Sequence, residues 1–131
     1  MSVAAFDHVA IPIRNIEAML AFYEGLGFSI DNQYAPRAYS VLFGQNKINF
    51  HAPQLWETGN FDLRGPSAKP GCGDFCFVWD GSQDALVFLL AECGATIIEG
   101  PISREGGRKV NGTSTYVRDP DDNLLEFMIY D

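Results

Sequence analysis

Positive charge is scarce in this chain of 131 residues, because nine lysine and arginine residues stand against 17 aspartate and glutamate residues, for a formal net charge of -8. Such a surface repels nucleic acid and anionic membranes, so neither is expected as a partner. No apolar run approaches the roughly 20 residues of a membrane span, and the first residues lack the pattern of an export signal. We therefore expect a cytoplasmic protein whose partner is a small molecule or a second copy of itself.

Cysteine and histidine are also rare. The three cysteines, Cys72, Cys76 and Cys93, are an odd number without the spacing of a zinc ribbon, so neither a disulfide framework nor a structural zinc site is expected. A reducing compartment fits this content. The two histidines, His8 and His51, are few enough that the position of each is informative.

The order of predicted elements occurs twice along the chain. Strands are expected at residues 6–13, 28–32, 39–43 and 47–51 around one helix between Asn15 and Gly27, and again at 75–79, 96–99, 114–118 and 124–130 around a helix at 83–93. Each set is a βαβββ module. The prediction is a single domain, 1–131, with module one at about 5–52, a connector rich in glycine and proline at 53–72, and module two at about 73–131.

Two such modules predict an α+β fold in which a pseudo-twofold axis relates them and a curved, half-open barrel encloses a cleft. A glycine-rich stretch, 100–112, is predicted to be a loop. It carries the basic cluster Arg104, Arg108 and Lys109, which is either a solvated surface or an anion-binding lid.

A shift of 75 residues aligns residues 41–51 with 116–126 without a gap, so that His51 coincides with Glu126. Near the start of each module, His8 matches Asp74. These four side chains are the predicted metal ligands. Imidazole with carboxylate suits a first-row divalent ion, so Fe, Mn, Ni, Co and Zn are all open.

Glu126 is the strongest functional candidate, because it interrupts an otherwise apolar strand and a carboxylate there is costly to desolvate unless it is paired or metal-bound. Glu126 and His51 are the predicted proton-transfer residues. Asp74 follows a glycine-rich turn, and the alternative for it is a turn acceptor for backbone amides.

Several motifs together resemble the vicinal oxygen chelate superfamily, which includes glyoxalase I, extradiol dioxygenases, and fosfomycin and bleomycin resistance proteins. The motifs lie at residues 7–11 (DHVAI), 21–28 (AFYEGLGF), 99–101 (EGP) and 116–126 (YVRDPDDNLLE). Residues 47–51 (KINFH) further resemble small single-unit glyoxalase-domain proteins. The resemblance implies paired βαβββ modules, a divalent metal held on the first and last strands of each module, and a homodimer.

The chain departs from the family pattern at three places. Asp74 stands where histidine is usual, His51 where glyoxalase I has glutamate, and Asp122 where the turn usually has glycine. The first two exchange the ligand types between modules. The third is expected to alter the turn and not the site, because aspartate tolerates a left-handed conformation.

Two classes of function follow as expectations. The first is a metal-dependent enzyme whose substrate chelates through vicinal oxygens, with lyase- or isomerase-like proton transfer favoured and ring-cleaving dioxygenase chemistry open through His8, His51 and Glu126. The second is a non-enzymatic binding protein of the bleomycin-resistance type, with an aromatic groove formed by Trp56, Phe61, Tyr34 and Tyr39. Modules could pair within one chain or by exchange between two chains.

Overall fold

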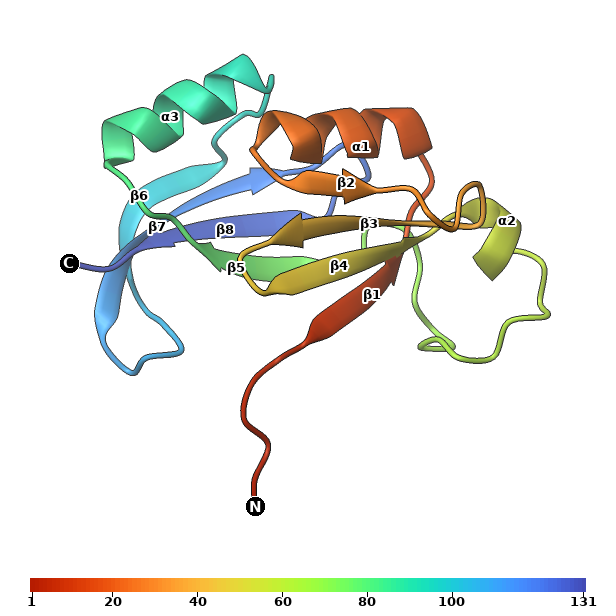
Figure 1. Cartoon of the computed structure of the whole chain (residues 1–131). Helices are drawn as coiled ribbons and strands as arrows, with labels where there is room; N and C mark the ends of the chain where they lie inside the picture. Colours follow the sequence, from red (N-terminus) through yellow and green to blue (C-terminus); the bar gives the residue numbers. More distant parts are fainter. The chain divides into compact units, whose positions relative to one another are not determined.

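A computed structural model describes all 131 residues, which form two compact units, residues 1–72 and 73–131. Each unit contains a four-stranded open sheet and one long helix that lies across it (Figure 1). The predicted α+β class and the repeated βαβββ order are confirmed. No helix has the length and apolar character needed to cross a membrane.

Unit one is built around a parallel pair of strands. Its elements are β1 (His8–Pro12), α1 (Ile16–Gly25), β2 (Ser29–Asp31), β3 (Ala38–Phe43), β4 (Asn46–His51) and the short α2 (Pro53–Trp56), and the sheet order is β1-β4-β3-β2. The α1 side chain Tyr23 is fully buried and packs edge-on against Phe50 of β4 at 5.3 Å between ring centroids. The core of unit one therefore lies between α1 and one face of this sheet.

Unit two repeats the arrangement. Its elements are β5 (Asp74–Val78), α3 (Gln83–Glu92), β6 (Glu99–Glu105), β7 (Asn111–Arg118) and β8 (Leu124–Ile129), and the sheet order is β5-β8-β7-β6. Ser82 caps α3 by accepting a hydrogen bond from the Ala85 amide at 3.1 Å. The Gln83 amide donates to the Thr115 hydroxyl of β7 at 3.0 Å, which fixes α3 over the face that carries Thr115.

The prediction of a loop at residues 100–112 is wrong, because most of this stretch belongs to β6 and β7. Its glycines indicated a loop, yet the antiparallel ladder satisfies the backbone groups of both strands. Only a tight turn remains, closed by the hydrogen bond from the Gly106 amide to the Val110 carbonyl at 3.1 Å. Residues 96–98, predicted as strand, lie outside β6.

Side-chain alternation gives each sheet a helix-covered face and an opposite face, which we call the distal face of that unit. Val9 pairs with buried Ile48, and Phe75 pairs with buried Leu125, so both lie half-buried on helix-covered faces. The polar residues of the central strands lie on the distal faces, where the candidate site is found.

Candidate functional site

Glu126 lies at the centre of the unit-two distal face. It sits in the middle of β8, directly opposite Cys76 of the parallel strand β5 and Tyr116 of the antiparallel strand β7. The hydroxyl of buried Ser114, also on β7, donates a hydrogen bond to Glu126 Oε2 at 2.5 Å. Such short bonds are typical of a hydroxyl donating to an ionised carboxylate. The carboxylate is thus held on three sides by its own sheet.

The two cross-strand neighbours of Glu126 are neutral donors. Partial burial raises the pKa of the Cys76 thiol to about 11, and the nearby charges of Glu126 and Asp74 contribute to the rise. Burial, followed by smaller effects of Glu126, also raises the pKa of the Tyr116 phenol, against a hydrogen bond with Arg104 that lowers it. Both groups therefore keep their protons near pH 7 and lie beside the carboxylate as its cross-strand neighbours. No lysine, arginine or histidine forms an ion pair with Glu126.

The turn at residues 119–123 fixes the start of β5. Asp119 Oδ1 accepts hydrogen bonds from the Asp121 and Asn123 amides at 2.9 and 3.0 Å, and its Oδ2 accepts one from the Asn123 side chain at 2.8 Å. Asn123 Oδ1 in turn accepts the Gly73 amide at 2.7 Å. This network places Asp74, the next residue, on the distal face two positions from Cys76. Asp74 and Glu126 therefore face the same side as diagonal neighbours.

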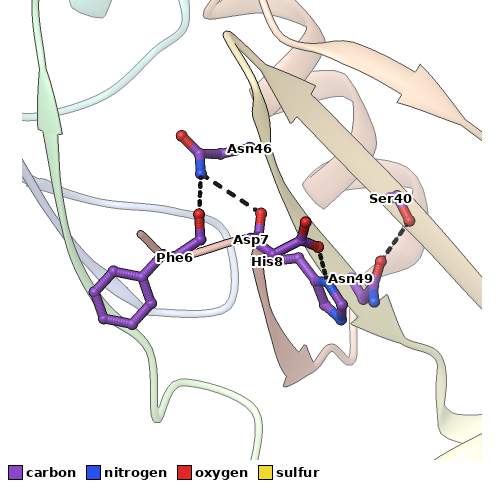
Figure 2. A network of polar contacts seen from close by, with 6 residues as sticks. All are labelled: Phe6, Asp7, His8, Ser40, Asn46 and Asn49. Carbon is purple, nitrogen blue, oxygen red and sulfur yellow. Dashed lines mark hydrogen bonds and ion pairs between the residues drawn. The ribbon is translucent and has the colours of Figure 1, made fainter. Parts of the chain in front are cut away.

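His8 is the predicted ligand of unit one and is oriented by its neighbour. Its Nδ1 lies 2.6 Å from Asp7 Oδ1, and this hydrogen bond is the main cause of a lowered Asp7 pKa (Figure 2). Because an ionised carboxylate only accepts hydrogen bonds, Nδ1 carries a proton, which makes Nε2 the metal-binding nitrogen of the neutral imidazole. The Asn46 side chain donates to the Phe6 carbonyl at 3.0 Å, which holds this segment beside β4.

His51 lies apart from His8. In the parallel ladder His8 pairs with Lys47, whereas His51 pairs with Pro12, so the two histidines are four positions apart, or about 13 Å along the strand. His51 is buried and packs edge-on against Phe61 at 5.2 Å between ring centroids. Burial and then the Arg64 charge lower its pKa. Since a metal–imidazole bond is about 2 Å, this separation opposes one ion shared by both histidines.

The ladder also corrects the internal alignment. Asp74 pairs with Leu124 as His8 pairs with Lys47, so the position that corresponds to Glu126 is Asn49 and not His51. The true shift is 76 residues for the third strand, where Ser40 corresponds to Tyr116, and 77 for the last strand, because the chain between the paired residues is one residue longer in the second hairpin. Asn49 accepts a hydrogen bond from the Ser40 hydroxyl at 2.8 Å (Figure 2). This pair occupies the ladder positions of Tyr116 and Glu126.

The sequence reasoning did not find four residues of this site: Asn49, Cys76, Ser114 and Tyr116. The alternation of residues along strands 114–118 and 75–79 was an available signal, since it places these side chains on the same face as Glu126 or its counterpart. No group of three or more histidine, cysteine, aspartate or glutamate side chains is close enough together to hold a metal ion. The donors present are an oriented imidazole in unit one, and two carboxylates on one face in unit two.

The arrangement of two βαβββ units with ligand-type residues on their first and last strands has known counterparts. The family model "Glyoxalase/Bleomycin resistance protein/Dioxygenase superfamily" matches residues 5–127. The chain belongs to this superfamily. Similar members include "Virulence protein STM3117" of Salmonella typhimurium, 31% identical over 99% of this chain and 87% of its own length. "Glyoxalase domain-containing protein RDO1" of Mycosarcoma maydis is 34% identical over 99% of this chain and 70% of its own length.

Solved structures of other proteins have the same fold as this chain. Integron cassette protein VCH_CASS1 from the mobile metagenome of V. cholerae is 32% identical, with a TM-score of 0.86 over 100% of this chain and 98% of its own. Lactoylglutathione lyase from Agrobacterium tumefaciens has a TM-score of 0.71 at 20% identity, covering 98% of this chain and 96% of its own. TnmS3, an antibiotic binding protein from Streptomyces sp. CB03234, has a TM-score of 0.74 at 19% identity, covering 100% and 99%. The last two show the shared fold alone, and that fold includes both an enzyme and a binding protein.

Proposed function

We propose that this superfamily member is a metal-dependent enzyme whose small substrate chelates a divalent ion through two neighbouring oxygens, and that Glu126 is its central ligand. The supporting observation is the environment of Glu126. Its carboxylate is half-buried in the middle of a sheet, receives a short hydrogen bond from Ser114 and has no cationic side chain paired with it. A desolvated carboxylate of this kind is stabilised when a cation binds.

His8 and Asp74 are the further ligands in this proposal. His8 offers Nε2 while Asp7 holds Nδ1, which is the usual support for a metal-bound imidazole. Asp74 shares the distal face of Glu126 and is expected to be optional. His51 is predicted to keep its metal-ligand or proton-transfer role only if a second site exists, since it lies four positions from His8. Superfamily membership favours Fe, Mn, Ni, Co or Zn as the ion.

When bound, the ion would polarise a substrate oxygen and make a neighbouring C–H bond more acidic. The chain's own contribution is a carboxylate that the Ser114 hydroxyl holds in one orientation between Cys76 and Tyr116. Proton transfer of the lyase or isomerase kind is therefore the proposed reaction class. Ring cleavage of catechols is the second candidate, through an iron ion with His8 and Glu126 among its ligands.

Metal titration of the purified protein by calorimetry tests the proposal. Wild-type protein is expected to bind about one Mn²⁺ or Zn²⁺ per chain, and Glu126→Gln to lower the affinity by roughly a hundredfold, as loss of a charged ligand would. Glu105→Gln is the matched control, because it removes the same charge from the same unit on the opposite face. Equal affinities of Glu126→Gln and wild type would contradict the proposal. Asp74→Ala is expected to retain binding.

The reaction class requires a separate screen. Metal-loaded protein would be assayed with hemithioacetals, catechols and fosfomycin, and the Glu126→Gln variant would serve as the inactive reference. Tight binding of a drug-like ligand by metal-free protein, with no turnover in this screen, would favour the non-enzymatic binding function instead. That function needs no carboxylate at residue 126, so Glu126→Gln would leave the ligand affinity unchanged.

We further propose that the protein is a homodimer and works in the cytoplasm. Several large apolar side chains are exposed in the single chain, among them Phe88, Ile98 and Val78 at 69%, 51% and 57%. A second copy would cover part of such a surface. The three cysteines are free, which suits a reducing compartment. Light scattering at micromolar concentration tests the dimer, and a strictly monomeric protein would contradict it.

A further inference from the structure

A bulge in β6 brings an arginine to the face of Glu126. Glu99 pairs with Tyr116 and Ile102 pairs with Ser114, so three β6 positions oppose two of β7. In a regular strand Glu99 and Arg104, five positions apart, would face opposite sides. The extra residue of the bulge places both on the distal face, because Arg104 pairs with Gly112, which shares that face with Ser114.

Gly100 makes this bulge possible. Its φ is +106°, and a Cβ there would lie 2.3 Å from the Ser114 carbonyl oxygen, so no other residue fits. The motif at residues 99–101 therefore has a structural consequence within the site. It directs two charged side chains of β6 toward the face that carries Glu126.

The Arg104 side chain extends back along β6 toward the centre of the sheet. Its Nη2 lies 3.7 Å from Glu99 Oε1, and its guanidinium is close enough to the Tyr116 phenol to lower the pKa of that group. Glu99 and Tyr116 are cross-strand partners, and Tyr116 is in turn the partner of Glu126. Tyr116 thus stands between the strand that carries Arg104 and the strand that carries Glu126.

The guanidinium keeps donors for a further partner. The guanidinium donates one hydrogen bond to the backbone, from Nη1 to the Ser103 carbonyl at 3.1 Å. Its ion pair with Glu99 is long and solvent-exposed. Such surface pairs contribute little to stability. The remaining N–H groups of arginine form a fork that matches a carboxylate. Arg108, by contrast, is placed over the Tyr130 ring at 4.3 Å.

We propose that Arg104, positioned beside Tyr116, binds a carboxylate of the substrate, so that the substrate is a small 2-oxo or 2-hydroxy acid. This inference rests on the proposed function, since Glu126 then lies beside the oxygenated carbon. Glu99 is a positioning residue that steers the guanidinium. Of the basic cluster Arg104, Arg108 and Lys109, only Arg104 has this role.

Calorimetry with pyruvate and methyl pyruvate tests the assignment, because the two probes share vicinal oxygens and differ in the charge of the carboxyl group. Wild type is expected to bind pyruvate about tenfold more tightly, as a charge-assisted bidentate contact would allow. Arg104→Gln should abolish this preference, and Arg104→Lys should restore only part of it. Arg108→Gln, the matched control in the same hairpin, should leave it unchanged.

Tyr116→Phe should reduce pyruvate affinity by a few fold and shift the Arg104 Nε–Hε resonance in the free protein. The inference is overturned if Arg104→Gln binds pyruvate as wild type does, if Arg108→Gln loses as much, or if wild type shows no preference for pyruvate. The titrations are run with and without Mn²⁺. If the protein binds metal but Arg104→Gln has no effect on pyruvate binding, the proposed function stands and the carboxylate site is wrong. If the preference for pyruvate depends on Arg104 but no metal binds, the carboxylate site stands and the proposed function is wrong.

Discussion

Replacement of Asn123 by alanine is expected to destabilise the protein strongly and to loosen the start of β5. Asn123 is fully buried, donates to Asp119 Oδ2 at 2.8 Å and accepts the Gly73 amide at 2.7 Å. Asn123→Ala removes both side-chain bonds, each of which contributes about 1 kcal/mol net. It also leaves the buried Gly73 N–H without a partner, at a further cost of about 1–3 kcal/mol. The expected loss is therefore about 3–5 kcal/mol of unfolding free energy.

Urea unfolding monitored by circular dichroism would measure this loss, with Asn111→Ala as the matched control. Asn111 is an exposed asparagine at the start of β7, so its replacement should change the free energy of unfolding by less than about 0.5 kcal/mol. Hydrogen exchange adds a local measurement, since the Gly73 amide should exchange faster in Asn123→Ala. A loss below about 1 kcal/mol, or an unchanged Gly73 exchange rate, would refute the view that this turn anchors β5.

Three further predictions concern single residues. Asp122 has a φ of +71°, so Asp122→Gly should stabilise the protein by about 1 kcal/mol in the same urea assay, and a destabilised variant would contradict the strain argument. Cys72 and Cys76 are both exposed, but the pKa of Cys76 is raised to about 11, so its alkylation by iodoacetamide at pH 8 should be slower than that of Cys72 and should increase up to about pH 11. Faster reaction of Cys76 at pH 8 would be inconsistent with this environment. The folded-state pKa of His51 is lowered, so the contribution of His51 to stability is present above the ordinary value of 6.5 and is lost as the pH falls through the folded-state pKa. His51→Phe should therefore flatten the decline in unfolding free energy between pH 6.5 and 5. An unchanged decline would show that other groups cause it.

The sequence alone determined the repeated order of elements and the family. Helical spacing in residues 16–26 and alternation in the strands are local properties, and they predicted both modules apart from β6 and the first residues of β7. The motif at 116–126 carried the resemblance that the family match over residues 5–127 confirms. Glu126 was also found from the sequence, because a carboxylate in an apolar strand is anomalous without any knowledge of its neighbours.

The neighbours of Glu126 could not be predicted in the same way. Which residues stand beside it depends on the register of three strands, and register is set by turn lengths and ladder hydrogen bonds far from residue 126. A gap-free alignment ignored the longer second turn and equated Glu126 with His51, whereas the ladder equates it with Asn49.

The bulge at Gly100 is a second feature that only the tertiary structure determines. From the sequence, residues 100–112 were a glycine-rich loop, and Arg104 was one of three basic residues without an assigned face. Pairing with β7 turned the stretch into a strand, and the extra residue of the bulge reversed the side on which Arg104 projects relative to Glu99. A local pattern fixes which element a residue joins, but the long-range backbone pairing of that element decides which side chains it meets, because one position of slip moves a side chain to the opposite face of the sheet.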